Sequence, residues 1–227
     1  MSIPKYIDHT LLRATATEKE IIQLCNEAVE YDFYAVCVNG CYVRTCWESL
    51  SAHNKNKTPA VKIASVVGFP LGAMDSISKI NESEDAIKNG ATEIDMVINL
   101  SFLKSRKYDE VEYEIKKIKE VIGHNILKVI IETCYLDEEE KKIATKIVCN
   151  AGADFVKTST GFGPGGATIE DILLMKSVTQ NKIQIKASGG IRDYETAIRY
   201  IDAGVTRIGT SNGIQIVTGQ KQGEQNY

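Results

Sequence analysis

The chain has 227 residues, of which 43% are hydrophobic and 25% charged, the balance of an ordinary globular protein with room for one core of its own. Its 27 Lys and Arg residues against 30 Asp and Glu give a net charge of −3, which argues against nucleic acid as a partner. No stretch approaches the roughly 18 apolar residues of a membrane span, and the first residues lack the apolar core of a signal peptide. We therefore expect a cytoplasmic protein without a membrane partner.

Short strand-like runs alternate with longer helical patterns along the chain. Eight candidate strands are each separated by about one helical unit: 6–10, 34–38, 61–68, 93–99, 127–133, 155–159, 183–188 and 207–209. This alternation predicts an α/β fold, a single-domain (β/α)8 TIM barrel over residues 1–217, followed by a polar C-terminal tail at 218–227. A doubly wound open sheet is the structural alternative.

Local signals for helix ends support this organisation. Three helical patterns end at a glycine that a strand follows at once: Gly90, Gly152 and Gly204. The residues five positions further on are Asp95, Lys157 and Gly209. The repeated unit therefore predicts similar heights for these three residues along their strands. Capping residues also stand at three helix starts, each with an acidic residue three positions later: Thr17, Asp137 and Thr168.

Glycine-rich loops follow the last three predicted strands. In barrels of this kind, the loops after the seventh and eighth strands often bind phosphate through backbone N–H groups. We therefore expect a small phosphorylated ligand, held by six residues: Gly161, Gly189, Gly190, Gly209, Ser211 and Asn212. The alternative is that these loops are tight turns that bind nothing.

Two lysines stand inside predicted strands, where an unpaired ammonium group is costly to bury. Side-chain alternation places Lys157 and Lys186 on the barrel-facing side of neighbouring strands. Two ammonium groups at such positions repel each other, which lowers the pKa of one and makes it a candidate nucleophile. The alternative is that each lysine reaches solvent or pairs with a carboxylate.

Carboxylates near these lysines are candidates for proton transfer. Asp95 is predicted to point into the barrel and to act with relaying water, whereas a structural ion pair with either lysine is the alternative. Asp8 is a candidate auxiliary residue that orients inward groups, although an ordinary buried and hydrogen-bonded aspartate explains it as well. Cys37 is interpreted as a small core residue rather than a nucleophile.

The cysteines and histidines do not predict a metal site. The six cysteines form no C-x-x-C pair and are interpreted as reduced thiols. The three histidines lie far apart in the sequence, so no zinc-ligand cluster is expected. A metal site assembled from distant residues is the alternative. Without a metal, carbonyl chemistry requires another electron sink.

Five segments together closely resemble the deoxyribose-phosphate aldolase family, class I aldolases of the (β/α)8 fold: 8–12, 93–99, 155–162, 186–192 and 207–211. The resemblance implies reversible cleavage of 2-deoxy-D-ribose 5-phosphate to D-glyceraldehyde 3-phosphate and acetaldehyde, without metal or cofactor. It implies that Lys157 forms the Schiff base. Asp95 and Lys186 then serve as the proton donor/acceptor and as the group that tunes the nucleophile.

The same resemblance bears on assembly and on the phosphate contacts. It suggests a homodimer. It also suggests that a tail ending in a tyrosine, here Tyr227, folds over the site and assists proton transfer, with a disordered tail as the alternative. Some family members carry Ser-Ser where this chain has Ser211 and Asn212, and an asparagine amide still donates a hydrogen bond.

Two other classes of protein fit part of the pattern. A phosphosugar isomerase or a ribose-phosphate-binding synthase on this barrel would use the same glycine loops, but would not require two inward lysines. A non-catalytic sensor would bind deoxyribose phosphate without consuming it. Turnover separates the sensor from the enzymes, and substitution of Lys157 separates the aldolase from the isomerase.

Overall fold

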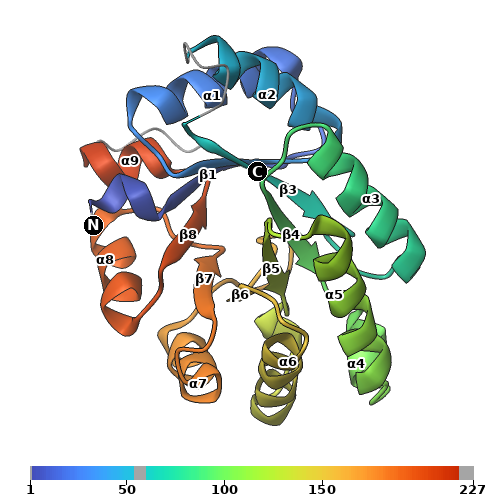
Figure 1. Cartoon of the computed structure of the whole chain (residues 1–227). Coiled ribbons are helices and arrows are strands. Elements are labelled where there is room, and N and C mark those ends of the chain that lie inside the picture. Colours follow the sequence, from blue (N-terminus) through green and yellow to red (C-terminus); the bar gives the residue numbers. More distant parts are fainter. Residues whose placement is uncertain (1, 54–59, 220–227) are drawn as a thin grey trace.

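The computed structural model describes residues 2–53 and 60–219. Eight parallel strands form a closed barrel, in which each strand pairs with the next and β8 returns to β1 (Figure 1). The strands are β1 Ile7–Leu11, β2 Ala35–Val38, β3 Lys62–Val67, β4 Glu93–Val97, β5 Ile126–Ile130, β6 Phe155–Lys157, β7 Gln184–Ser188 and β8 Arg207–Thr210. The predicted single-domain (β/α)8 barrel is thus confirmed, and the open sheet is excluded.

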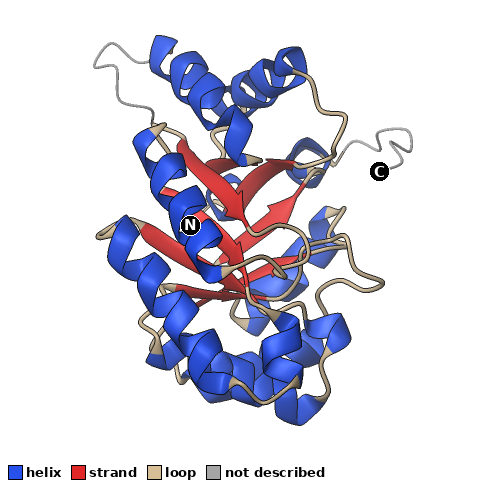
Figure 2. Cartoon of the chain, turned by 90° about the vertical axis from the view of Figure 1, so that its right-hand side faces the viewer, coloured by secondary structure: helices blue, strands red, loops and turns tan. Residues whose placement is uncertain are grey.

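Helices surround the barrel as an outer layer, with the strands inside (Figures 1 and 2). The α-helices of the described residues are α1 Glu18–Glu30, α2 Val43–Ala52, α3 Ser76–Lys88, α4 Leu100–Lys104, α5 Tyr108–Ile122, α6 Glu138–Asn150, α7 Ile169–Thr179, α8 Tyr194–Ala203 and α9 Gly213–Thr218. Within this part of the chain, no helix has both the length and the hydropathy needed to cross a membrane.

The predicted helix boundaries are present. The N–H of Glu140 donates to Asp137 at 2.8 Å, and the N–H of Asp171 donates to Thr168 at 3.1 Å. At the start of α1, the carboxylate of Glu20 accepts the N–H of Thr17 at 2.9 Å. Three glycines after helix ends have positive φ angles, which favour glycine there: Gly90, Gly152 and Gly204. Helix ends and strand starts therefore follow local chemistry.

The repeated unit sets the heights of three inward positions, as predicted. Asp95, Lys157 and Gly209 are each the third residue of their strand. In the barrel ladder, Asp95 pairs with Lys128 of β5, and Lys157 pairs with Lys186 of β7. The fold thus brings four ionisable side chains to neighbouring positions inside one barrel.

Strand β6 ends earlier than predicted, at Lys157 rather than at residue 159. Beyond this point, side-chain hydrogen bonds also join the chain to Ser188 of β7. The hydroxyl of Thr158 donates to the Ser188 carbonyl at 3.2 Å and accepts the Ser188 N–H at 3.1 Å, and the hydroxyl of Ser188 donates to the Ser159 carbonyl at 2.5 Å. Together with the N–H of Thr158, which donates to the carbonyl of Lys186 at 3.1 Å, these contacts keep the segment after Lys157 beside β7.

The hydrophobic core lies between the strands and the helices. Outward strand residues such as Ile94, Met96 and Val156 are fully buried in this layer. Inward residues of the same strands carry charged groups, so the apolar core and the polar centre are separated by side-chain alternation. The predicted tail starts at Thr218, which is the last residue of α9, whereas residues 220–227 lie outside the described residues.

Candidate active site

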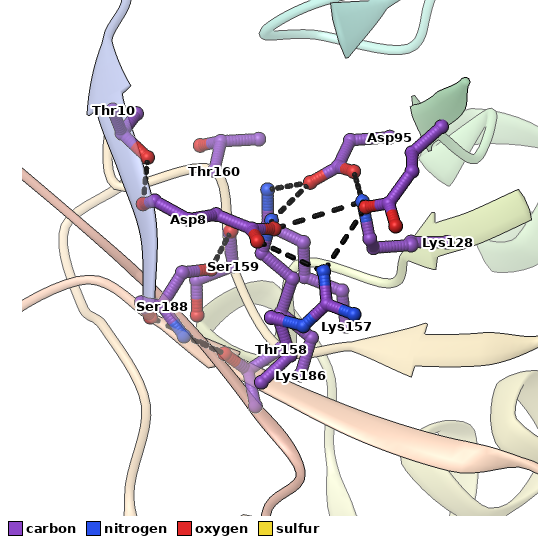
Figure 3. Close-up of polar contacts among 12 residues, drawn as sticks. Asp8, Thr10, Asp95, Lys128, Lys157, Thr158, Ser159, Thr160, Lys186 and Ser188 are labelled. Atoms are coloured by element: carbon purple, nitrogen blue, oxygen red, sulfur yellow. Dashed lines mark hydrogen bonds and ion pairs between the residues drawn. The ribbon is translucent and has the colours of Figure 1, made fainter. Parts of the chain in front are cut away.

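Lys157 stands at the carboxyl end of β6 with only 3% of its surface exposed. Its Nζ lies 2.7 Å from Oδ2 of Asp95 (Figure 3). Lys186, on the neighbouring strand β7, places its Nζ 2.7 Å from the same oxygen of Asp95. The predicted pair of inward lysines is therefore present, and one carboxylate oxygen lies between the two amines.

Asp8 completes this arrangement from β1. Its carboxylate accepts a hydrogen bond from Lys186 through Oδ2 and another from Arg207 through Oδ1, the latter at 2.9 Å. Asp8 is fully buried. The predicted auxiliary aspartate is thus in contact with one of the two lysines, and it holds that lysine beside Asp95.

Sequence reasoning missed a third lysine inside the barrel. Nζ of Lys128 lies 2.7 Å from Oδ1 of Asp95 and 2.5 Å from Oε2 of Glu93. The same Glu93 oxygen lies 3.1 Å from Nη1 of Arg207, whose guanidinium stacks 3.4 Å from the centroid of the Tyr34 ring. A lysine within an otherwise apolar strand was the available signal for Lys128.

These contacts join seven charged side chains in the described part of the barrel: Lys128, Lys157, Lys186, Arg207, Asp8, Glu93 and Asp95. Four cations against three carboxylates would leave one uncompensated positive charge in a buried site. Loss of one proton balances the cluster. Because buried charge is costly unless it is paired, one of the lysines is driven toward the neutral amine.

The pKa directions identify that lysine. Burial and the positive charge of Lys186 lower the pKa of Lys157 below its ordinary value, although Asp95 opposes the shift. Burial alone would lower the pKa of Lys186 too, but Asp8 and Asp95 raise it. Against the effect of its own burial, Asp95 is held ionised by its three lysines, which lower its pKa. Lys157 is thus the lysine of the pair that loses its proton more readily, whereas Lys186 is the one that is held as an ammonium group.

The side of the barrel next to Lys157 is apolar toward β2 and β3. Cys37, Ala64 and Val66 form a small buried cluster there, with Leu12 and Phe69 packed against it. Burial raises the pKa of the Cys37 thiol, so this residue is the core residue that we expected and not a thiolate.

Close approaches of backbone shape the mouth of the barrel above β6 and β7. Gly189 and Gly190 have φ angles of +85° and +84°. A Cβ atom at Gly166 would lie 2.2 Å from the carbonyl oxygen of Gly189, and one at Gly189 would lie 3.7 Å from Cα of Gly161. The predicted glycine loops therefore pack against each other at the mouth.

The loop after β8 reaches the same end of the barrel. The N–H of Asn212 donates to the hydroxyl of Thr210 at 2.9 Å, and the hydroxyl of Ser211 contacts the amide oxygen of Asn212 at 3.3 Å. Gly209 lies deeper, where a Cβ atom would be 3.1 Å from Cε of Lys186. Glycine at this position leaves room for the lysine.

The chain is similar to known proteins in its sequence and in its fold. The sequence pattern of the family described as DeoC/LacD family aldolase matches residues 3–217. The chain belongs to this family of aldolases. A deoxyribose-phosphate aldolase from Brevibacillus brevis is 51% identical over 227 residues, which is 100% of both chains.

Solved aldolase structures agree with the family assignment. The aldolase QR15 superposes with a TM-score of 0.90 at 46% identity, covering 96% of each chain. A tetrameric deoxyribose phosphate aldolase from Aeropyrum pernix superposes with a TM-score of 0.84 at 31% identity, covering 95% of this chain and 89% of that one. The barrel of this DeoC/LacD aldolase is thus shared with two solved aldolases.

One predicted site residue of this DeoC/LacD aldolase falls outside the described residues, namely Tyr227. Within the described ranges, no group of three or more His, Cys, Asp and Glu side chains is arranged to hold a metal ion. The described residues therefore offer a buried amine with a lowered pKa, Lys157, in contact with the carboxylate of Asp95, which also contacts the amine of Lys186.

Proposed function

We propose that this chain is a class I aldolase that reversibly cleaves 2-deoxy-D-ribose 5-phosphate into D-glyceraldehyde 3-phosphate and acetaldehyde. The observation that carries the proposal is the position of Lys157, a buried amine with a lowered pKa that shares the Asp95 carboxylate with Lys186. Membership of an aldolase family and relatives named for this substrate support the choice of reaction.

Lys157 supplies the electron sink. In the cleavage direction its neutral amine attacks C1 of the open-chain sugar. The adduct takes up a proton, supplied by Lys186 through Asp95, and loses water to give a protonated imine. A base takes the proton of the 3-hydroxyl group while the bond between C2 and C3 breaks. The electron pair of that bond enters the iminium system and forms an enamine. The bond is C2–C3 because acetaldehyde retains C1 and C2.

Release of the second product restores the amine. Protonation of the enamine at C2 regenerates the iminium ion, and addition of water frees acetaldehyde and Lys157. Asp95 is suited to proton transfer because its Oδ2 lies 2.7 Å from both amine nitrogens. Lys186 keeps Asp95 ionised, holds down the pKa of Lys157 and returns protons through Asp95 and water.

The phosphate group of the substrate is proposed to bind at the mouth near β7 and β8. Gly189 and Gly190 present backbone there without side chains, and Gly161 lies beside Gly189. Ser211 and Asn212 follow β8 at the start of the short helix α9. Such loops are a common anion site in barrels of this fold. An anchored phosphate would hold C1 within reach of Lys157.

Location and assembly are proposals of the same kind. We propose a cytoplasmic enzyme, because all six cysteines are free thiols, the state that a reducing compartment maintains. We also propose a homodimer. The Aeropyrum pernix relative is a tetramer. Light scattering of the purified protein distinguishes the two assemblies.

The decisive test is turnover of 2-deoxy-D-ribose 5-phosphate, measured by release of both aldehydes, for the wild type and Lys157→Leu. The proposal predicts turnover by the wild type and none by the variant. Substrate that binds without being consumed would favour a sensor. A product that keeps all five carbons, formed equally by Lys157→Leu, would favour a phosphosugar isomerase.

A further inference from the structure

Glu132 has an unusual backbone conformation for a buried residue. Five residues other than glycine have a positive φ in the described ranges: Asp32, Arg106, Glu132, Gln180 and Asn181. Four of them are exposed, whereas Glu132 is 2% exposed. Its φ and ψ of +50° and +68° place it in the left-handed region, just beyond the carboxyl end of β5. Strain of this kind persists where surrounding contacts enforce it, and it is frequent at functional sites.

The contacts that enforce this conformation bind the chain directly after Lys157. On either side of Glu132, the N–H of Ile131 donates to the carbonyl of Lys157, and the N–H of Thr133 donates to the carbonyl of Thr158, both at 3.0 Å. The left-handed turn between these two bonds directs the Glu132 side chain toward Thr160. Three consecutive residues thus hold positions 157, 158 and 160.

The carboxylate of Glu132 fixes the turn that begins the loop between β6 and α7. It accepts the N–H of Thr160 at 3.1 Å and also the hydroxyl of the same residue. The hydroxyl oxygen of Thr160 in turn accepts the N–H of Phe162 at 3.0 Å. A buried carboxylate with several donors is a strong anchor, because hydrogen bonds to an ionised acceptor are stronger than neutral ones.

This turn carries the first of the glycine loops at the mouth, the one after β6. Gly161 lies within it, and its Cα would be 3.7 Å from a Cβ atom at Gly189. A Cβ atom at Gly163 would be 2.9 Å from Sγ of Cys134 and 3.5 Å from Cδ of Glu132, so the loop also packs tightly on the Glu132 side. The loop is therefore held between Glu132 and Gly189.

We infer that Glu132 is a positioning residue for the phosphate end of the substrate. It holds Thr160 and Gly161 against Gly189, so that the anion loop is formed before the substrate binds. The inference rests on the proposed function, because it assumes that a phosphate binds at these loops. Because the N–H and the hydroxyl of Thr160 both donate to Glu132, they are not available to the phosphate. Glu132 therefore sets the geometry of the loop, and other donors bind the phosphate.

The test compares two substrates, 2-deoxy-D-ribose 5-phosphate and unphosphorylated 2-deoxy-D-ribose, through the ratio of their kcat/KM values. Glu132→Ala is expected to lower this ratio about tenfold, mainly through a higher KM for the phosphorylated sugar. Glu132→Gln keeps an oxygen acceptor, so its ratio is expected to stay close to that of the wild type. Glu139→Ala, a change at an exposed glutamate on α6, is the matched control and should leave the ratio unchanged.

A second variant separates the carboxylate from the backbone. Glu132→Gly accepts the left-handed conformation without strain but lacks the carboxylate, so it folds even if Glu132→Ala does not. A ratio as low as that expected for Glu132→Ala would support the inference. An unchanged ratio in Glu132→Gly, or equal losses on both substrates in Glu132→Ala and Glu132→Gln, would overturn it. A wild type that fails to cleave either sugar would instead overturn the proposed function.

Discussion

Lys157 and Asp95 meet through one short contact, 2.7 Å between Nζ and Oδ2, although 62 residues separate them in the sequence. The same oxygen is shared with Lys186, which Asp8 also binds. Asp95 therefore contacts two amines whose pKa values move in opposite directions, lowered for Lys157 and raised for Lys186. This asymmetry supports the proposal that Lys157 is the nucleophile and that Lys186 is a source of positive charge and protons.

Replacing Lys157 with methionine should abolish turnover without harming the fold. The variant keeps a side chain of similar length, and it leaves three cations opposite three carboxylates in the barrel. We expect kcat to fall by roughly 10³-fold or more, because no imine forms. The free energy of unfolding, measured by urea denaturation, should be equal to or higher than that of the wild type. A clearly less stable variant would show that Lys157 is charged and paired in the resting protein.

The rate of imine formation should depend on pH through Lys157. Only the neutral amine attacks an aldehyde, so trapping with acetaldehyde and cyanoborohydride slows as pH falls through the pKa of Lys157. In a plot of trapping rate against pH, this fall is the acid limb. Because burial and Lys186 lower the pKa of Lys157, the acid limb should lie below the ordinary lysine value of 10.5.

Lys186→Met should move this acid limb to higher pH. The substitution removes a positive charge that lowers the pKa of Lys157, and it leaves the opposing effect of Asp95 in place. At a fixed pH on the acid limb, the trapping rate then falls, because a smaller fraction of Lys157 is the neutral amine. The exposed Lys88→Met on α3 is a control that should leave the limb in place. An acid limb that is identical in Lys186→Met and the wild type would disprove the tuning role of Lys186.

Asp8→Asn should destabilise the protein in a pH-dependent way. The change leaves Lys186 and Arg207 in a buried site with one carboxylate fewer, which is expected to cost about 3–5 kcal/mol in free energy of unfolding near neutral pH. Although burial opposes the shift, Lys186, Arg207 and Lys128 hold the pKa of Asp8 below its ordinary value of 3.8.

The sign of the pH effect follows from that lowered pKa. A carboxylate with a lowered pKa in the folded state stabilises the protein fully above pH 3.8 and loses this contribution as the pH falls further. The difference in stability between the wild type and Asp8→Asn should therefore narrow below this pH. Denaturation curves of both proteins at neutral and acidic pH measure this difference in the free energy of unfolding. A difference that stays the same at both pH values would contradict an ionised Asp8.

Gly166→Ala should weaken recognition of the phosphorylated substrate. The new Cβ atom would lie 2.2 Å from the carbonyl oxygen of Gly189, so the two loops must move apart. We expect KM for 2-deoxy-D-ribose 5-phosphate to rise about tenfold, while KM for acetaldehyde in the synthetic direction changes little. Gly40→Ala, whose nearest neighbour would be Oγ of Ser65 at 3.7 Å, is the control. Unchanged KM values in Gly166→Ala would place the phosphate elsewhere.

Much of the fold follows from local signals in the sequence. Capping residues at Thr17, Asp137 and Thr168 mark helix starts, and the glycines that end helices set where the next strands begin. Because side chains alternate between the two faces of a strand, the positions of Lys157 and Lys186 in their predicted strands also predict that both point into the barrel. The early end of β6 was not predictable from side-chain alternation, and the contacts of the following segment with Ser188 of β7 are tertiary features.

The charged cluster was predicted only in part. Lys128 lies 33 residues from Asp95, and Arg207 lies 199 residues from Asp8, so these pairs exist only once the barrel closes. The partner of each lysine decides the direction in which its pKa moves, and sequence alternation does not supply that partner. The role of Glu132 was likewise hidden, because its left-handed backbone and its contact with Thr160 are tertiary features.

The most direct measurement is to incubate the protein with acetaldehyde, reduce it with borohydride, and locate the adduct by mass spectrometry of its peptides. Reduction fixes only an imine, so the label marks the amine that reacted. Schiff-base catalysis by Lys157 predicts an ethyl group concentrated on this residue, and the loss of that label in Lys157→Met. Labels scattered over exposed lysines, with Lys157 unmodified, would contradict it.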